Sequence, residues 1–169
     1  MPLGAYASER GSIRSGDLLA WSAPRGLGRM VRILTGGSWS HVGIAWWSGP
    51  PDAPGSRLFV LEMREFRGVT MRPASAAVPF DWVRLGATWT PEATTAVFDE
   101  FGSPYGWGAL IPLWLGRWRR RHGRVCSTWA ADRLRAAGIT IRSDRRGHTP
   151  SSLVESLIRN GLELRGVVR

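Results

Sequence analysis

Short apolar runs, separated by segments rich in Gly, Pro and Ser, dominate the first half of the chain. They occupy residues 18–21, 41–47, 58–63, 68–71 and 80–85. Apolar runs of about four to eight residues that end in turn residues are typical of β-strands. We therefore predict that this half of the chain is mostly β-structure.

A helical spacing of apolar residues appears between and after these runs. A Thr-Pro pair at 90–91 and again at 149–150 favours a helix start, because threonine caps free N–H groups and proline fits the first helical position. Glycines at 36 and 138 follow periodic segments, where helices commonly end. The predicted helices are 27–34, 91–101, 126–137 and one from 150, with a short apolar helix after the connector 102–108 and a closing strand at 162–168.

The first 15 residues show no periodic pattern and are rich in Gly, Ser and Arg. We predict a flexible basic arm at 1–15 and a single domain at 16–169. The chain has 169 residues, of which 43% are hydrophobic and 21% charged. This composition fits one ordinary globular domain and not a disordered polyelectrolyte.

The net charge is +10, and every basic side chain other than histidine is an arginine. A strongly positive protein attracts anionic partners such as nucleic acid, lipid headgroups or an acidic cell-wall polymer. A GC-rich genome, which replaces Lys with Arg, explains the composition equally well, so both explanations stay open. The residues that we expect at an anionic surface are Arg117, Arg119, Arg120, Arg121 and Arg124.

The single cysteine excludes an intrachain disulfide and a zinc site built from several cysteines. We expect neither a metal nor an organic cofactor. Residues 1–14 lack the apolar segment of a secretory signal, and the longest apolar stretch, 107–115, is shorter than the roughly 20 residues of a membrane span. The expected location is cytoplasmic or peripheral to a membrane, with unconventional export as an alternative.

Cys126 is the first residue of a predicted helix. Free N–H groups and the positive end of the helix dipole favour a thiolate there, although lone cysteines often pack as small hydrophobic residues. His41 opens a predicted strand after a polar turn and is suited to take the thiol proton. His122 and His148 lie in Arg-rich segments that we expect to be solvated.

Glu62 lies on the neighbouring predicted strand, where an inward-facing carboxylate would hold the far nitrogen of the histidine. A simple ion pair with Arg64, two residues away on the same face, is the alternative. Glu65 on the opposite face, Asp17 in a turn and Asp132 further along the cysteine helix are weaker choices.

The order of these motifs resembles the circularly permuted NlpC-type cysteine peptidases, a branch that includes the YiiX-like proteins and lecithin retinol acyltransferase. In this branch the histidine strand precedes the cysteine helix. The motifs that carry the resemblance are Ser15-Gly16-Asp17-Leu18-Leu19, Ser40-His41-Val42-Gly43-Ile44, Glu62 with Gly68-Val69, Cys126-Ser127, and Thr149-Pro150-Ser151-Ser152-Leu153.

The resemblance implies an α+β, papain-like domain, in which an antiparallel sheet packs against a helix that bears the nucleophilic cysteine at its N-terminus. It implies Cys126 as nucleophile, His41 as general base and Glu62 as the orienting residue. No metal or organic cofactor is needed for that chemistry.

Three further residues are candidates for contacts with the oxyanion or the substrate. Tyr105 ends the connector Gly102-Ser103-Pro104-Tyr105, which resembles a tyrosine-bearing connector of the family. Ser127 follows the cysteine, and Trp39 stands where the family pattern has a smaller or tyrosine-like residue. Such a tryptophan narrows the expected cleft.

The implied function is a cysteine hydrolase that acts on an amide bond, as in a bacterial cell-wall peptide. One alternative is a thiol acyltransferase or lipid ester hydrolase at a membrane surface. The other is a non-enzymatic, Arg- and Trp-rich protein that binds nucleic acid or a membrane surface. No obligatory protein partner is implied.

Overall fold

The computed structural model describes residues 3–23, 26–86, 88–106, 124–141 and 148–168. It contains a six-stranded antiparallel sheet with the strand order β4-β3-β2-β1-β5-β6. The strands are β1 (Leu18–Trp21), β2 (His41–Trp47), β3 (Leu58–Arg64), β4 (Gly68–Pro73), β5 (Phe80–Val83) and β6 (Leu164–Val168).

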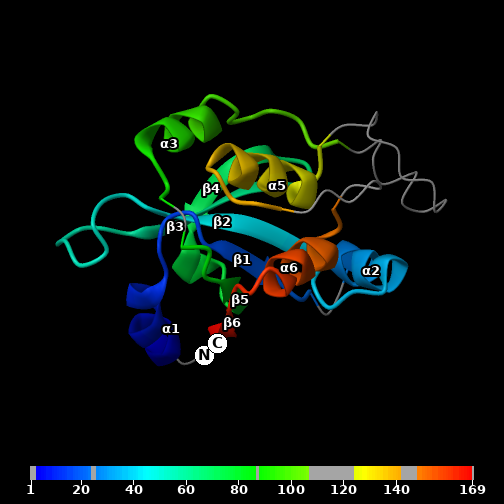
Figure 1. Cartoon of the computed structure of the whole chain (residues 1–169), viewed down its shortest axis with the longest axis horizontal. Coiled ribbons are helices and arrows are strands. Elements are labelled where there is room, and N and C mark those ends of the chain that lie inside the picture. The colour runs from blue at the N-terminus through cyan, green and yellow to red at the C-terminus, as the bar shows by residue number, and fades with distance from the viewer. Residues whose placement is uncertain (1–2, 24–25, 87, 107–123, 142–147, 169) are drawn as a thin grey trace.

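Helices lie along the sheet and at its ends (Figure 1). The α-helices of the described residues are α1 (Leu3–Glu9), α2 (Gly26–Thr35), α3 (Pro91–Phe98), α5 (Cys126–Ala136) and α6 (Pro150–Arg159), and the 3-10 helices are η1 (Arg10–Ser12) and η2 (Ala74–Ala76). The predicted α+β class and antiparallel sheet are therefore confirmed. The predicted apolar helix after the connector, and Arg117 to Arg121, lie outside the described residues.

The sheet is covered on both faces, because neighbouring residues of one strand belong to two different core clusters. Val42 and Ile44 of β2 pack with Trp129 of α5 and Leu157 of α6 in the first cluster. Ala45, the next residue of β2, belongs to the second cluster on the opposite face. Burial on both faces explains why the strands read as continuous apolar runs without a polar alternation.

Within the predicted basic arm 1–15, Tyr6 and Ile13 pack against the second face of the sheet, so this described part is not a loose arm. Tyr6 is 6% exposed and Ile13 is fully buried. The indole Nε1 of Trp47 donates a hydrogen bond of 3.0 Å to the Ile13 carbonyl, and Arg10 lies over the Trp47 ring. Periodicity missed this segment because two isolated apolar anchors, seven residues apart, give no repeating pattern.

Within the described residues, no helix is both long and apolar enough to cross a membrane.

Candidate functional site

Cys126 is the first residue of α5, and the N-terminus of this helix lacks a side-chain cap among the described residues. The N-cap position is Val125, which has no polar side-chain atom, whereas Thr90 and Thr149 cap α3 and α6 by accepting N–H bonds of 3.2 and 3.1 Å. When no side chain caps the start of a helix, its first N–H groups and the positive end of its dipole can interact with a neighbouring anion. In α5 the nearest candidate is the Cys126 thiol, because Cys126 is the first residue of the helix.

His41 is the first residue of β2 and connects Cys126 to Glu62. Its Nε2 lies 2.6 Å from Oε2 of Glu62, and its ring interacts with the Cys126 side chain, which raises the pKa of the imidazole. Because Glu62 occupies Nε2, Nδ1 is the nitrogen that remains for the thiol. The structure thus brings the three residues predicted from the sequence into one row.

Glu62 on β3 can contact His41 on β2 because the two strands come close together at Gly43. A Cβ at this position would lie 3.0 Å from the Leu61 carbonyl oxygen, 3.2 Å from Cβ of Glu62 and 2.7 Å from a methyl group of Val60. The ladder between β2 and β3 begins next to it, at the pair Ile44–Leu61. Glycine at 43 therefore leaves the space through which Glu62 extends to the start of β2.

Glu62 is a fully buried carboxylate with cations on both sides. Nε of Arg72 on β4 lies 2.6 Å from Oε1, while Nε of Arg64 is 3.9 Å away. Burial by itself raises the pKa of the Glu62 carboxyl, but the hydrogen bond and charge of His41 and the charge of Arg72 outweigh it and lower the pKa. Glu62 is thus held as a carboxylate, and its closest ion pairs are with His41 and Arg72, not with Arg64.

The pKa of His41 is raised. Burial of the imidazole alone lowers the pKa, but the interactions with Cys126 and with Glu62 favour the proton and raise the pKa to about 10. The imidazole therefore holds a proton at neutral pH. A protonated imidazole beside a thiol is the arrangement that stabilises a thiolate.

Sequence reasoning missed two residues that support the histidine. The Trp21 ring, opposite His41 on β1, lies 5.5 Å from the imidazole ring. The Arg72 guanidinium lies over Trp21 at 5.4 Å, so it contacts both the carboxylate and the indole. The sequence signal that could have indicated Arg72 is an arginine directly after the apolar run of β4. In the sheet, Arg72 lies two residue pairs away from the pair formed by Glu62 and Thr70.

Tyr105 lies near Cys126 in the first core cluster. It is 8% exposed, and burial raises the pKa of its phenol, with the neighbouring Cys126 and Glu65 adding to the effect. The connector is fixed on β4, where Val69 donates to the Ser103 carbonyl at 3.1 Å. Gly68, with φ of 71°, makes room there, since a Cβ would overlap that same oxygen.

Ser127 and Trp39 are tied to the scaffold and not to the cysteine. The Ser127 hydroxyl donates to the backbone carbonyl of His148. The Trp39 indole donates to Oδ2 of Asp81 at 2.7 Å, and its backbone N–H donates to Ser151 at 2.9 Å. Their side chains therefore position α5, α6 and the segment before His41 relative to one another.

The competing residues have structural partners elsewhere. His148 was predicted to be solvated but is 4% exposed, with Nε2 2.8 Å from the Arg135 guanidinium. Asp17 is buried and accepts backbone N–H bonds, including one of 3.0 Å from Leu85, and Asp132 pairs with Arg135. His122 lies outside the described residues. Of the predicted basic cluster, Arg124 is described and pairs with Glu100 at 2.6 Å.

No family model matches the chain, and no curated protein matches it. Among solved structures, one described as metalloprotein YiiX from Escherichia coli O157:H7 aligns with a TM-score of 0.57 at 14% identity. The alignment covers 77% of this chain and 69% of the other. The fold resembles that of YiiX. At this identity the likeness to YiiX shows the fold alone, and it agrees with the YiiX-like order of motifs in the sequence.

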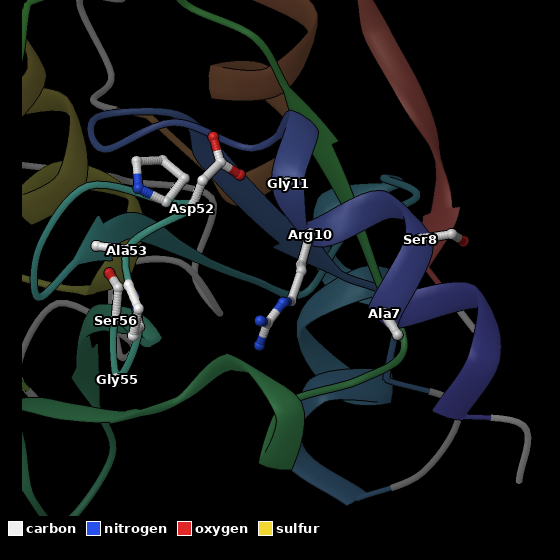
Figure 2. Close-up of a pocket in the computed structure, with 10 residues that line it drawn as sticks. Ala7, Ser8, Arg10, Gly11, Asp52, Ala53, Gly55 and Ser56 are labelled. Carbon is white, nitrogen blue, oxygen red and sulfur yellow. The ribbon is translucent and has the colours of Figure 1, made fainter.

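A separate hollow of about 490 Å³ lies between η1 and the hairpin that joins β2 to β3 (Figure 2). Its lining includes Arg10, Gly11 and Asp52. The hairpin follows Trp47, at the opposite end of β2 from His41. This hollow therefore contributes no group to the site around Cys126.

Proposed function

We propose that the chain is a cysteine hydrolase of the permuted NlpC type, with Cys126 as nucleophile, His41 as base and Glu62 as the orienting residue of a papain-like arrangement. One observation carries the proposal. His41 lies 2.6 Å from a fully buried carboxylate and also interacts with the thiol of Cys126, which is the first residue of helix α5. Titratable groups whose pKa values are perturbed by burial and by a specific charged partner are candidates for a functional site, and here a cysteine joins such a pair.

The proposed reaction follows from this arrangement. The thiol proton resides on His41, and the thiolate of Cys126 attacks the carbonyl carbon, so that the π electrons move to oxygen. N–H groups of the first turn of α5 and the Tyr105 hydroxyl stabilise the oxyanion. The oxyanion collapses and expels the amine, which takes the proton from His41. Water, deprotonated by His41, attacks the acyl carbon and displaces the Cys126 sulfur, which releases the acid and restores the thiolate beside the protonated His41.

We favour an amide as the substrate, as in a cell-wall-type peptide. A lipid ester, or transfer of the acyl group to another acceptor, follows the same steps up to the acyl-enzyme. Glu62 supports either reaction by occupying Nε2 of His41, which leaves Nδ1 to exchange a proton with the thiol.

YiiX is described as a metalloprotein, but the residues of this site do not fit a metal ion. Within the described part of the chain, no group of three or more His, Cys, Asp or Glu side chains is arranged to hold one. Oε2 of Glu62 faces His41, and Oε1 faces the Arg72 guanidinium at 2.6 Å. Because the Arg72 guanidinium already pairs with Oε1 of Glu62, this oxygen is not available as a metal ligand. The proposed steps therefore use protein groups only.

The test is to trap the acyl-enzyme. Incubation with a p-nitrophenyl ester and with a set of peptide amides is expected to add one acyl group to the protein, seen by intact mass and mapped to Cys126 after digestion. Cys126→Ser and His41→Ala should abolish the adduct, whereas Asp132→Asn, an exposed change on the same helix, should leave it intact. An adduct that survives Cys126→Ser, or none with any acyl donor, would contradict the proposal.

A further inference from the structure

Helix α2 turns its large apolar side chains outward. Met30, Ile33 and Leu34 are 44%, 67% and 41% exposed. Their spacing of three and four residues places them on one face of the helix. Among the described side chains of α2, the buried one is Val31. The apolar face of this helix is thus largely on the surface.

Gly28 brings α2 close to the chain segment before His41, and this contact helps to fix the orientation of the helix. Gly28 faces the chain just before His41, and a Cβ there would lie 3.1 Å from the Ser40 hydroxyl. The Thr35 hydroxyl donates to the Val31 carbonyl at 2.8 Å. Because the close approach at Gly28 leaves no room for a large side chain, α2 cannot roll its apolar face inward.

The turn between β3 and β4 exposes a second apolar side chain. Phe66 is 86% exposed and has φ of 64°, a left-handed conformation that is uncommon for a bulky residue. Arg64 and Arg67 flank it, and Arg67 closes the turn by donating to the Arg64 carbonyl at 3.3 Å. The turn therefore presents an aromatic ring that follows Glu65 and precedes Arg67 in the sequence.

Both elements leave the sheet at the end where His41 lies. α2 connects Trp21 to His41, which pair with each other at the ends of β1 and β2. The turn follows Arg64, at the end of β3 opposite to the pair Trp47–Leu58. Figure 1 shows α2 beyond this end of the strands.

Arginines outnumber acidic residues beside these side chains in the sequence, with Glu65 directly before Phe66 as the acidic neighbour. Arg29 is exposed and borders Ile33 on α2, Arg32 is partly exposed, and Arg64 and Arg67 flank Phe66. The whole chain carries +10. We propose that α2 and the β3–β4 turn form a docking surface for an anionic lipid membrane, in which Met30, Ile33, Leu34 and Phe66 enter the headgroup region and the arginines contact lipid phosphates.

A lipid surface fits better than a protein partner. A stable protein interface uses about 20–30 residues on each side, whereas here a few apolar side chains protrude from two separate elements. A membrane accepts each side chain individually and supplies the negative charge. This inference goes beyond the proposed hydrolase activity, because docking requires none of the groups that act on the substrate.

The test is co-sedimentation of the full chain with vesicles of phosphatidylcholine alone and of phosphatidylcholine with phosphatidylglycerol. We expect binding to the anionic vesicles and little to the neutral ones. Ile33→Ser and Phe66→Ser should each weaken binding by roughly fivefold or more, and Arg29→Gln by roughly fivefold. Using Cys126→Ser as the background separates this result from the hydrolase proposal.

Matched controls are Ile158→Ser, which alters a 36% exposed aliphatic residue on α6, and Arg57→Gln, at the far end of β3. Both should bind like the parent, and circular dichroism should show that all variants are folded. Three results would overturn the proposal: no binding to anionic vesicles, unchanged binding of both Ile33→Ser and Phe66→Ser, or light scattering that shows a dimer abolished by Ile33→Ser. The last result would assign the surface to a second copy of the chain.

Discussion

Glu62 is a buried carboxylate whose charge depends on its two cations. Arg72 holds Oε1 and stacks on Trp21, while His41 holds Oε2. The lowered pKa of Glu62 means that its carboxylate stabilises the folded state above the unfolded value of about 4.5, and that this contribution is lost as the pH falls through the lower folded value.

Removing Arg72 should therefore move the acid side of the stability profile upward. In Arg72→Met, Glu62 keeps His41 and the more distant Arg64 but loses its closest guanidinium, so its folded pKa rises and the loss of stability on acidification begins at a higher pH than in the wild type. At pH 7 we expect a cost on the order of 3 kcal/mol, because a buried ion pair loses one partner. Urea unfolding at a series of pH values between about 3 and 8 measures both the acid profile and the stability cost at pH 7.

Arg72→Lys is the matched variant, since it keeps the charge but not the contact with Trp21. It should preserve the acid profile while losing part of the stability at pH 7. A profile for Arg72→Met that coincides with the wild type would mean that Arg72 does not hold the charge of Glu62.

The strands and helices were largely predictable from the sequence, and the reasons are local. The Thr-Pro starts of α3 and α6 mark helix boundaries through a hydroxyl cap. The bounds of β1 and β2 could be predicted from their apolar runs. Both faces of the sheet are covered, so every position of these strands favours an apolar residue and the run ends where the strand ends. Helix α1 escaped prediction because a surface helix held by Tyr6 has no apolar repeat.

The close approach of β2 and β3 gives a prediction about these strands. Gly43→Ala places a methyl group 3.0 Å from the Leu61 carbonyl oxygen and 3.2 Å from Cβ of Glu62. We expect the strands to separate locally, at a cost of about 1–3 kcal/mol, and the acyl-enzyme yield to fall as Glu62 moves away from His41.

Gly11→Ala is the control, because a Cβ at Gly11 meets no atom within 4 Å and its φ is not in the left-handed region. Its free energy of unfolding should be unchanged or slightly higher. Urea unfolding and intact-mass measurement of the acyl-enzyme follow both variants. If Gly43→Ala is as stable and as reactive as Gly11→Ala, the close approach has no role in the site.

Across the whole molecule, the order of the motifs indicated the site residues but not the neighbouring residues that contact them. Cys126, His41 and Glu62 lie far apart in the chain, and only the resemblance to a permuted family joined them before the structure did. Trp21 and Arg72 were not predicted, because a contact between β1 and β4, which flank β2 and β3, depends on strand order. The outward face of α2 was missed for a similar reason, since a helical pattern does not say which side meets the core.

The central claim is that His41 activates the Cys126 thiol as a nucleophile. The most direct test is the rate of iodoacetamide alkylation of Cys126 between pH 5.5 and 9 in the folded wild type, His41→Ala and the unfolded chain. Because Cys126 is 4% exposed, the shape of each pH profile is compared and not the absolute rate.

For an ordinary thiol the rate falls about tenfold for each pH unit below about 8.5. The account predicts that the folded wild type loses only a few-fold between pH 8 and pH 6, and that His41→Ala restores the steep dependence of the unfolded chain. A wild-type profile as steep as that of the unfolded chain, unchanged by His41→Ala, would contradict it and leave Cys126 as a packing residue.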